Sequence, residues 1–195
     1  MLPEQRKLSI LSSAKEMFAI KGYHETSITD IIKRANIARG TFYLYFKEKR
    51  DVFDALFDQL LDEINTSVKR VVVGNDQKPP MEQIADNLKR VFQLAADDPE
   101  LARILFRHAP GLDSITDQKI DNFYAKITAL IEGALALGTQ MGIVERCDFR
   151  LIAVFILGGV KDIVDKITRP DNNLPQIDTL INELTGFVLH GLSER

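Results

Sequence analysis

The feature that most limits the fold of this chain is a pair of short helical patterns, close together near the N-terminus. The first covers residues 28–35, where isoleucines recur at helical spacing. The second covers about residues 39–45, where Phe42 and Phe46 lie four apart and can face a core. Two short helices joined by a turn of a few residues form a helix-turn-helix. The spacing therefore predicts this motif.

The residues that flank the two patterns are those that begin and end helices. Ser27 and Asp30 fit a capping box, in which the serine accepts from an early amide and the aspartate lies in the first turn. Asn36 stands where a tight turn needs positive φ, a conformation that asparagine tolerates. Gly22 can adopt the left-handed conformation that ends the preceding helix.

The second short helix carries basic, small and hydroxyl-bearing aromatic side chains, which suit contact with DNA. Arg39 can bind a guanine bidentately, and Thr41 can reach a base edge or a thymine methyl. Gly40 allows a close approach of the backbone, and tyrosines and lysines further on suit phosphates. Composition alone leaves open a small helical subdomain with a solvated polar face.

A longer set of spaced residues, continuous over about a quarter of the chain, carries a resemblance to a known family. The set is Phe18, Gly22, Tyr23, Ser27, Ile28, Asp30, Ile31, Ala35, Gly40, Thr41, Phe42, Tyr43, Tyr45, Phe46, Lys49 and Asp51. It resembles the N-terminal DNA-binding domain of the tetracycline-repressor (TetR) family of bacterial regulators. One departure is Ala38, where the family usually has Ser or Thr, so the recognition helix lacks a side-chain N-cap worth about 1 kcal/mol.

The resemblance implies an all-α fold with two domains. Residues 1–48 would form a three-helix DNA-binding domain with the helix-turn-helix, and residues 49–195 a helical ligand-binding and dimerisation domain. The implied groove-facing residues are Arg39, Gly40, Thr41, Tyr43 and Leu44. The implied phosphate-binding residues are Ser27, Thr29, Tyr45 and Lys49.

The charge is distributed unevenly along the chain. The net formal charge is −3 at pH 7, which alone would argue against binding nucleic acid. Residues 1–50, however, hold ten Lys/Arg and five Asp/Glu, and residues 51–195 hold fifteen Lys/Arg and twenty-three Asp/Glu. A basic N-terminal segment of net charge +5 on an acidic body of −8 favours local contact with phosphates.

Several other classes of protein find no support in the sequence. The single Cys147 rules out an internal disulfide, and the three histidines show no metal-ligand spacing. We recognise no catalytic motif, and we predict no catalytic residue, metal or cofactor. No signal-like leader begins the chain and no apolar run approaches the roughly twenty residues that span a bilayer, so we expect a soluble cytoplasmic protein.

Helical periodicity continues through the rest of the chain. We predict helices at about residues 4–21, 49–72, 81–96, 99–108, 114–140, 149–168 and 174–192. Ser114 and Asp148 are the expected N-caps of two of them. Pro170 would stop the helix that precedes it.

The last two helices are expected to form a dimer interface. Residues 149–168 are apolar nearly all round, and the mid-helix glycines Gly158 and Gly159 would admit a closely packed helix. The resemblance implies a four-helix bundle with the same pair of a second subunit; burial within one subunit is the alternative. The predicted interface residues are Phe155, Gly158, Gly159, Asp162, Ile177, Leu180, Ile181, Leu184, Phe187 and Val188.

A ligand site is expected among the central helices, where aromatic side chains occur with a few polar ones. The predicted lining is Phe92, Arg103, Phe106, His108, Asn122, Phe123, Tyr124 and Phe155. Aromatic residues at helical spacing can equally be plain core, and His108 can equally cap a helix.

The sequence thus predicts a ligand-responsive transcriptional regulator of TetR type and not an enzyme. It would act as a homodimeric repressor on double-stranded DNA with a palindromic operator, released by a small apolar or amphipathic effector, and without a membrane partner. The alternatives are a helical protein–protein interaction module, and a small-molecule-binding protein or enzyme without a DNA role.

Overall fold

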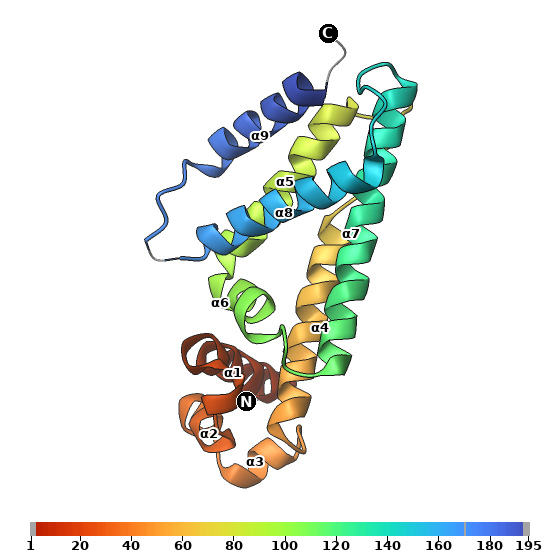
Figure 1. Cartoon of the computed structure of the whole chain (residues 1–195). Coiled ribbons are helices and arrows are strands. Elements are labelled where there is room, and N and C mark those ends of the chain that lie inside the picture. Colours follow the sequence, from red (N-terminus) through yellow and green to blue (C-terminus); the bar gives the residue numbers. More distant parts are fainter. Residues whose placement is uncertain (1–2, 170, 193–195) are drawn as a thin grey trace. The chain divides into compact units, whose positions relative to one another are not determined.

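The computed structural model describes residues 3–169 and 171–192, and within these ranges the chain forms helices without strands (Figure 1). This confirms the all-α fold class. The helices are α1 (Pro3–Glu25), α2 (Ile28–Ala35), α3 (Arg39–Tyr43), α4 (Lys49–Ser67), α5 (Pro80–Asp97), α6 (Pro99–Arg103), the π-helical turn η1 (Ile104–His108), α7 (Ser114–Gln140), α8 (Phe149–Ile167) and α9 (Ile177–Leu192).

The chain divides into two compact units that do not coincide with a single cut in the sequence. The first unit comprises residues 1–63 and 98–117, and the second comprises residues 64–97 and 118–195. The helices α4 and α7 each contribute residues to both units. The functional division expected between residues 48 and 49 remains a prediction.

The first unit has an aromatic core that holds the helix-turn-helix to α1 and the first half of α4. Phe18, Phe42 and Phe53 are fully buried there. The Phe53 ring lies edge-on to Phe18 at 5.8 Å and stacks on Phe57 at 5.9 Å between centroids. Aromatic pairs at such distances stabilise a core beyond the area they bury. This core fixes the position of α2 and α3.

The second unit is built on α5, which packs against both α8 and α9 (Figure 1). Phe92 of α5 is fully buried, and Leu180 and Ile181 of α9 are 8% and 6% exposed. On α8 the buried positions are Ala153 and Val164. The inward faces of α8 and α9 are therefore covered by their own subunit, whereas other faces of both helices stay exposed.

Two local predictions were wrong. The helix predicted to continue to about residue 72 ends at Ser67. The chain after it is not helical, because Gln83 and Asn87 of α5 use their amide groups to bind the backbone of Val72 and Lys69. The N-cap of α7 is Asp113 and not Ser114: the Asp113 carboxylate accepts from the Thr116 amide at 2.8 Å, and Ser114 is already helical.

Candidate nucleic-acid interface and ligand site

The N-terminus of α2 is closed by the predicted capping box. The Asp30 amide donates to the Ser27 hydroxyl at 3.1 Å, and the Ser27 amide donates to the Asp30 carboxylate at 2.9 Å. Lys21 forms an ion pair with the same carboxylate at 3.1 Å. The hydrogen bonds from Ser27, and then the one from Lys21, hold the pKa of Asp30 well below its usual range. The beginning of α2 is thus fixed relative to the end of α1.

The turn that leads to α3 has the expected geometry. Asn36 has φ 51° and ψ 51°, and its amide donates to carbonyls of the last turn of α2. Ala38 precedes α3 with an extended backbone and makes no side-chain cap, as expected because alanine has no polar side-chain atom. The structure therefore confirms both the left-handed turn and the uncapped start of the second helix.

The short helix α3 presents one face to the core and the other to solvent. Phe42 is fully buried and Phe46 is 5% exposed, which anchors the inner face. Arg39 and Gly40 are exposed, and Leu44 is 78% exposed. The Arg39 guanidinium lies over the Tyr43 ring at 5.9 Å from its centroid, so the arginine predicted to read bases is supported by a neighbouring aromatic ring.

The other predicted DNA contacts surround this face with varied accessibility. Ser27 and Thr29 at the start of α2 are exposed, and Thr41 and Tyr45 are partly buried. The Ser27 hydroxyl also donates to the Asp30 carboxylate at 2.7 Å, so it serves the capping box. Contacts of these residues with phosphate remain predictions.

Lys49 has a structural role that the sequence did not reveal. Its ammonium donates to the backbone carbonyls of Tyr23 and Thr26 at 2.5 and 2.7 Å, and to that of His24 at 3.2 Å. It also lies 4.3 Å from the centroid of the Tyr23 ring. Burial lowers the pKa of this amine. Lys49 thus ties the end of α1 to the start of α4 and satisfies carbonyls that no helix bond reaches.

Arg50, the next residue, joins α4 to the beginning of α7. Its Nε atom lies 2.9 and 3.0 Å from the two carboxylate oxygens of Asp54, and its terminal nitrogens bind Asp113 and, at 2.9 Å, the Thr116 hydroxyl. The hydrogen bond that Arg50 donates to Asp54 is the main reason that the pKa of Arg50 is raised. Helical periodicity does not predict the contacts with Asp113 and Thr116, because these two residues lie more than sixty positions away.

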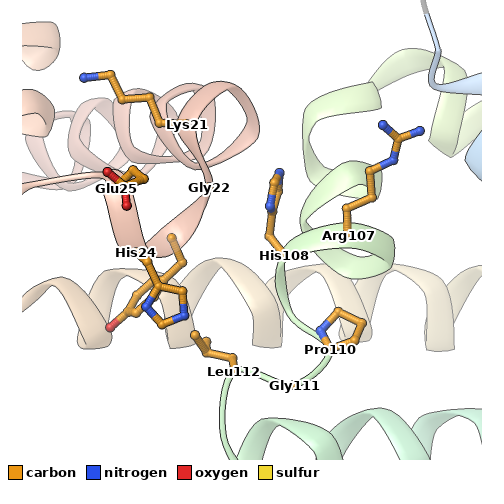
Figure 2. A pocket seen from close by; sticks show the side chains of 10 residues that line it. Lys21, Gly22, His24, Glu25, Arg107, His108, Pro110, Gly111 and Leu112 are labelled. Atoms are coloured by element: carbon orange, nitrogen blue, oxygen red, sulfur yellow. The ribbon is translucent and has the colours of Figure 1, made fainter.

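A polar cavity of about 310 Å³ lies within the first unit, between the end of α1 and the loop that follows η1 (Figure 2). The His108 ring faces Gly22, whereas the Arg107 side chain points away. Gly22 has φ 80°, and a Cβ atom added there would lie 3.4 Å from Nδ1 of His108. Burial lowers the pKa of His108, although a hydrogen bond to the backbone of Ala19 opposes that effect. His108 therefore contacts the end of α1.

The predicted ligand residues are divided between the two units. Arg103, Phe106 and His108 belong to the first unit. Phe92, Asn122, Phe123, Tyr124 and Phe155 belong to the second. Within the second unit, Phe92 and Phe123 are buried and the rings of Phe123 and Tyr124 lie 5.3 Å apart, but Asn122 is exposed and Phe155 is 67% exposed. Phe155 consequently does not line the interior of its own subunit.

The predicted dimer residues also separate into two groups. Leu180 and Ile181 are buried against their own subunit. Phe155 and Phe187 are exposed, as are Gly158, Gly159 and Asp162, while Ile177, Leu184 and Val188 are partly buried. Apart from the adjoining residues and backbone of α8 itself, no atom of the described chain would lie within 4 Å of a Cβ atom added to Gly158 or Gly159. These glycines do not serve a close contact inside the subunit.

The helix-turn-helix of the first unit matches a known family of proteins. Residues 10–56, which run from the first half of α1 to the first turns of α4, match the family described as bacterial regulatory proteins, tetR family. This N-terminal segment belongs to the TetR family. Its helices are accordingly the DNA-binding domain of a transcriptional regulator.

Known regulators also match nearly the whole chain. The fatty acid metabolism regulator protein of Bacillus subtilis (strain 168) is 26% identical over 189 residues, which cover 96% of both proteins. The crystal structure of a transcriptional regulator FadR from Bacillus subtilis in complex with stearoyl-CoA has a TM-score of 0.72 and 27% identity, and covers 95% of this chain and 98% of that one. AibR in complex with isovaleryl coenzyme A and operator DNA shares the fold, with a TM-score of 0.73 and 22% identity over 94% of this chain and 98% of its own.

The described residues include no candidate for a membrane-spanning helix. None of the helices between residues 3 and 192, residue 170 apart, is both long enough and apolar enough to cross a bilayer.

Proposed function

We propose that this protein is a transcriptional repressor that binds a palindromic operator as a homodimer and is released by an acyl-coenzyme A thioester. The acyl-CoA would be bound and released unchanged, without turnover. The protein would act in the cytoplasm, where bacterial DNA and acyl-CoA occur together.

The observation that carries the DNA-binding part is the exposed face of α3. Arg39 stands on the Tyr43 ring at the start of a helix whose other face is anchored by buried Phe42 and Phe46. Such a helix can enter the major groove with its first residues at base edges. In the proposed assignment Arg39 and Thr41 read bases, and Ser27, Thr29 and Tyr45 contact phosphates.

The dimer is supported by an apolar face that a single subunit leaves uncovered. Leu151, Val154 and Phe155 of α8 are 65%, 54% and 67% exposed, and Phe187 of α9 is 65% exposed. Exposed apolar patches of this kind mark interaction surfaces. The exposed Gly158 and Gly159 on the same helix would allow the backbone of a second α8 to approach closely. Two such subunits would place two recognition helices on the halves of a palindrome.

The effector class is supported by similarity along the whole chain, beyond the helix-turn-helix. The relative from Bacillus subtilis that matches 96% of this chain regulates fatty acid metabolism, according to its name. The FadR structure, 27% identical, holds stearoyl-CoA. The buried apolar side chains of α5 and α7, which include Phe92 and Phe123, suit an acyl chain better than a sugar or an ion.

The experiment begins with selection of an operator from random or genomic fragments. Fluorescence anisotropy then measures binding to that operator in the presence of acetyl-, isovaleryl-, octanoyl-, palmitoyl- and stearoyl-CoA, with free coenzyme A as the control. At least one thioester should weaken operator binding tenfold or more, while free coenzyme A leaves it unchanged. Operator binding that no thioester weakens would refute the proposed effector class. Chromatography of the recovered thioester should show it intact.

A further inference from the structure

In the second unit, Lys161 is the one charged residue at the inward-facing positions of α8. The inward positions of α8 recur at helical spacing: Ala153, Leu157, Lys161, Val164 and Thr168. Ala153, Val164 and Thr168 are buried, at 0%, 6% and 3% exposure. Lys161 occupies the middle of this stripe and is partly buried itself.

The ammonium of Lys161 lies over an aromatic ring and not beside a carboxylate. Its Nζ atom is 3.8 Å from the centroid of the Tyr124 ring of α7. In the part of the chain that the structure describes, no ion pair joins Lys161 to an acidic side chain. Two other lysines of this unit do have such partners: Lys166 pairs with Asp162 at 2.5 Å, and Lys89 pairs with Asp178 at 2.7 Å.

The surroundings of Lys161 favour an anionic group that the protein does not supply. Burial alone lowers the pKa of this lysine, and burial raises the pKa of Tyr124 to about 12, so both polar groups are withdrawn from water. A ring face attracts a cation but compensates only part of the cost of removing it from water. An anionic oxygen beside the ammonium would complete the compensation with a charge-assisted hydrogen bond.

We propose that Lys161 is the anchor for the anionic oxygen group, a carboxylate or a phosphate, of an amphipathic acyl ligand. The Tyr124 ring holds the ammonium in position before the ligand arrives, and the apolar positions around it receive the acyl chain. This proposal rests on the proposed function, because it locates the polar end of the effector in the second unit.

The test compares direct binding of three probes to the full-length dimeric protein by isothermal titration calorimetry. The chain contains no tryptophan, so heat is a better signal than intrinsic fluorescence. The probes are palmitate, palmitoyl-CoA and the uncharged hexadecanol, each below its micellar concentration. The variants are Lys161→Met, which keeps the length of the side chain without its charge, and Lys161→Arg, which keeps a charge. Lys166→Met is the matched control on the same helix.

Lys161→Met should weaken at least one of the two anionic probes by about tenfold or more and leave hexadecanol unchanged. Lys161→Arg should retain most of the affinity, and Lys166→Met should bind all three probes like the wild type. Because methionine suits a partly apolar site, the melting temperature of Lys161→Met should not fall, which separates loss of an anchor from loss of the fold. A loss confined to palmitate identifies the carboxylate as the anchored group; a loss confined to palmitoyl-CoA identifies the phosphates.

Equal binding of the anionic probes by wild type and Lys161→Met would overturn the proposal. So would an equal loss for hexadecanol, or a wild-type protein that binds neither anionic probe. Failure of the proposed function looks different, because it is measured at the operator. If acyl-CoA releases operator from wild type and Lys161→Met alike, the anchor is refuted and the function stands. If palmitoyl-CoA binds through Lys161 but no thioester releases the operator, the function fails and the anchor stands.

Discussion

Replacing Lys49 by methionine tests whether this lysine holds the helix-turn-helix together or binds the phosphate backbone. In the structure its ammonium donates to three carbonyls at the end of α1 and lies over the Tyr23 ring. A hydrogen bond to a charged group contributes about 1.5–3 kcal/mol. Burial of the ammonium, which lowers its pKa, offsets part of the gain from three such contacts. We therefore expect Lys49→Met to reduce the free energy of unfolding by about 2 kcal/mol.

For a chain of this length such a loss corresponds to a melting temperature lower by about 5 °C, measurable by circular dichroism. At a temperature where both proteins are folded, the salt dependence of operator binding should be unchanged. Lys47→Met is the matched control, because Lys47 is exposed and two residues away. It should leave the melting temperature unchanged and, if Lys47 contacts phosphate, reduce the salt slope by about one. A Lys49→Met protein with an unaltered melting temperature and a slope reduced by one would show that Lys49 is a phosphate contact instead.

Three further substitutions test the recognition helix, the dimer and the contact with the end of α1. Arg39→Ala should weaken operator binding by about 1–3 kcal/mol and relax the preference at one base pair, and an unchanged preference in a binding-site selection would contradict this role. Phe187→Asp should give monomers in sedimentation equilibrium, because it places a charge in an apolar contact; a dimer of normal affinity would move the interface elsewhere. Since the folded pKa of His108 lies below its ordinary value, the unfolded chain takes up a proton first on acidification. Wild-type stability should thus decline as the pH falls from 7 to 5, and His108→Gln should decline less; equal slopes would count against a buried neutral imidazole.

The local features of the fold could be predicted because they depend on neighbours in the sequence. The capping box of Ser27 and Asp30, the left-handed Asn36 and the N-cap Asp148 all act within a few residues. The end of α4 could not be predicted in this way. The residues after Ser67 continue a helical pattern, but side chains of α5 bind their backbone in a non-helical form.

The same distinction between local and distant contacts applies to the residues of the candidate site. The exposed face of α3 follows from helical spacing, since buried Phe42 and Phe46 determine which residues remain outside. Arg50 contacts Asp113, and Lys161 contacts Tyr124. Each contact joins distant segments of the chain, so a periodic pattern does not reveal it. Aromatic composition also fails to separate a buried position from an exposed one.

Phe92 and Phe155 illustrate that failure. Both were expected to line the ligand site, yet Phe92 is fully buried and Phe155 is 67% exposed. A signal for Lys161 was nonetheless present in the sequence. A lysine at an inward position of an apolar helix is unusual enough to suggest a functional partner.

Thermodynamic linkage gives the last prediction and limits how strongly any acyl-CoA can act. An effector shifts the protein away from its DNA-binding conformation only by the difference between its affinities for the two conformations. The factor by which palmitoyl-CoA weakens operator binding must then equal the factor by which operator weakens palmitoyl-CoA binding. Anisotropy of labelled operator and calorimetry with the thioester measure the two factors independently. Lys161→Met should weaken thioester binding, so more thioester is needed for half-release, but the two factors should remain equal to each other. Unequal factors would mean that the thioester and the DNA do not act on one protein species, as when the lipid releases DNA by aggregating the protein, because two ligands that bind one protein species at equilibrium share one coupling energy.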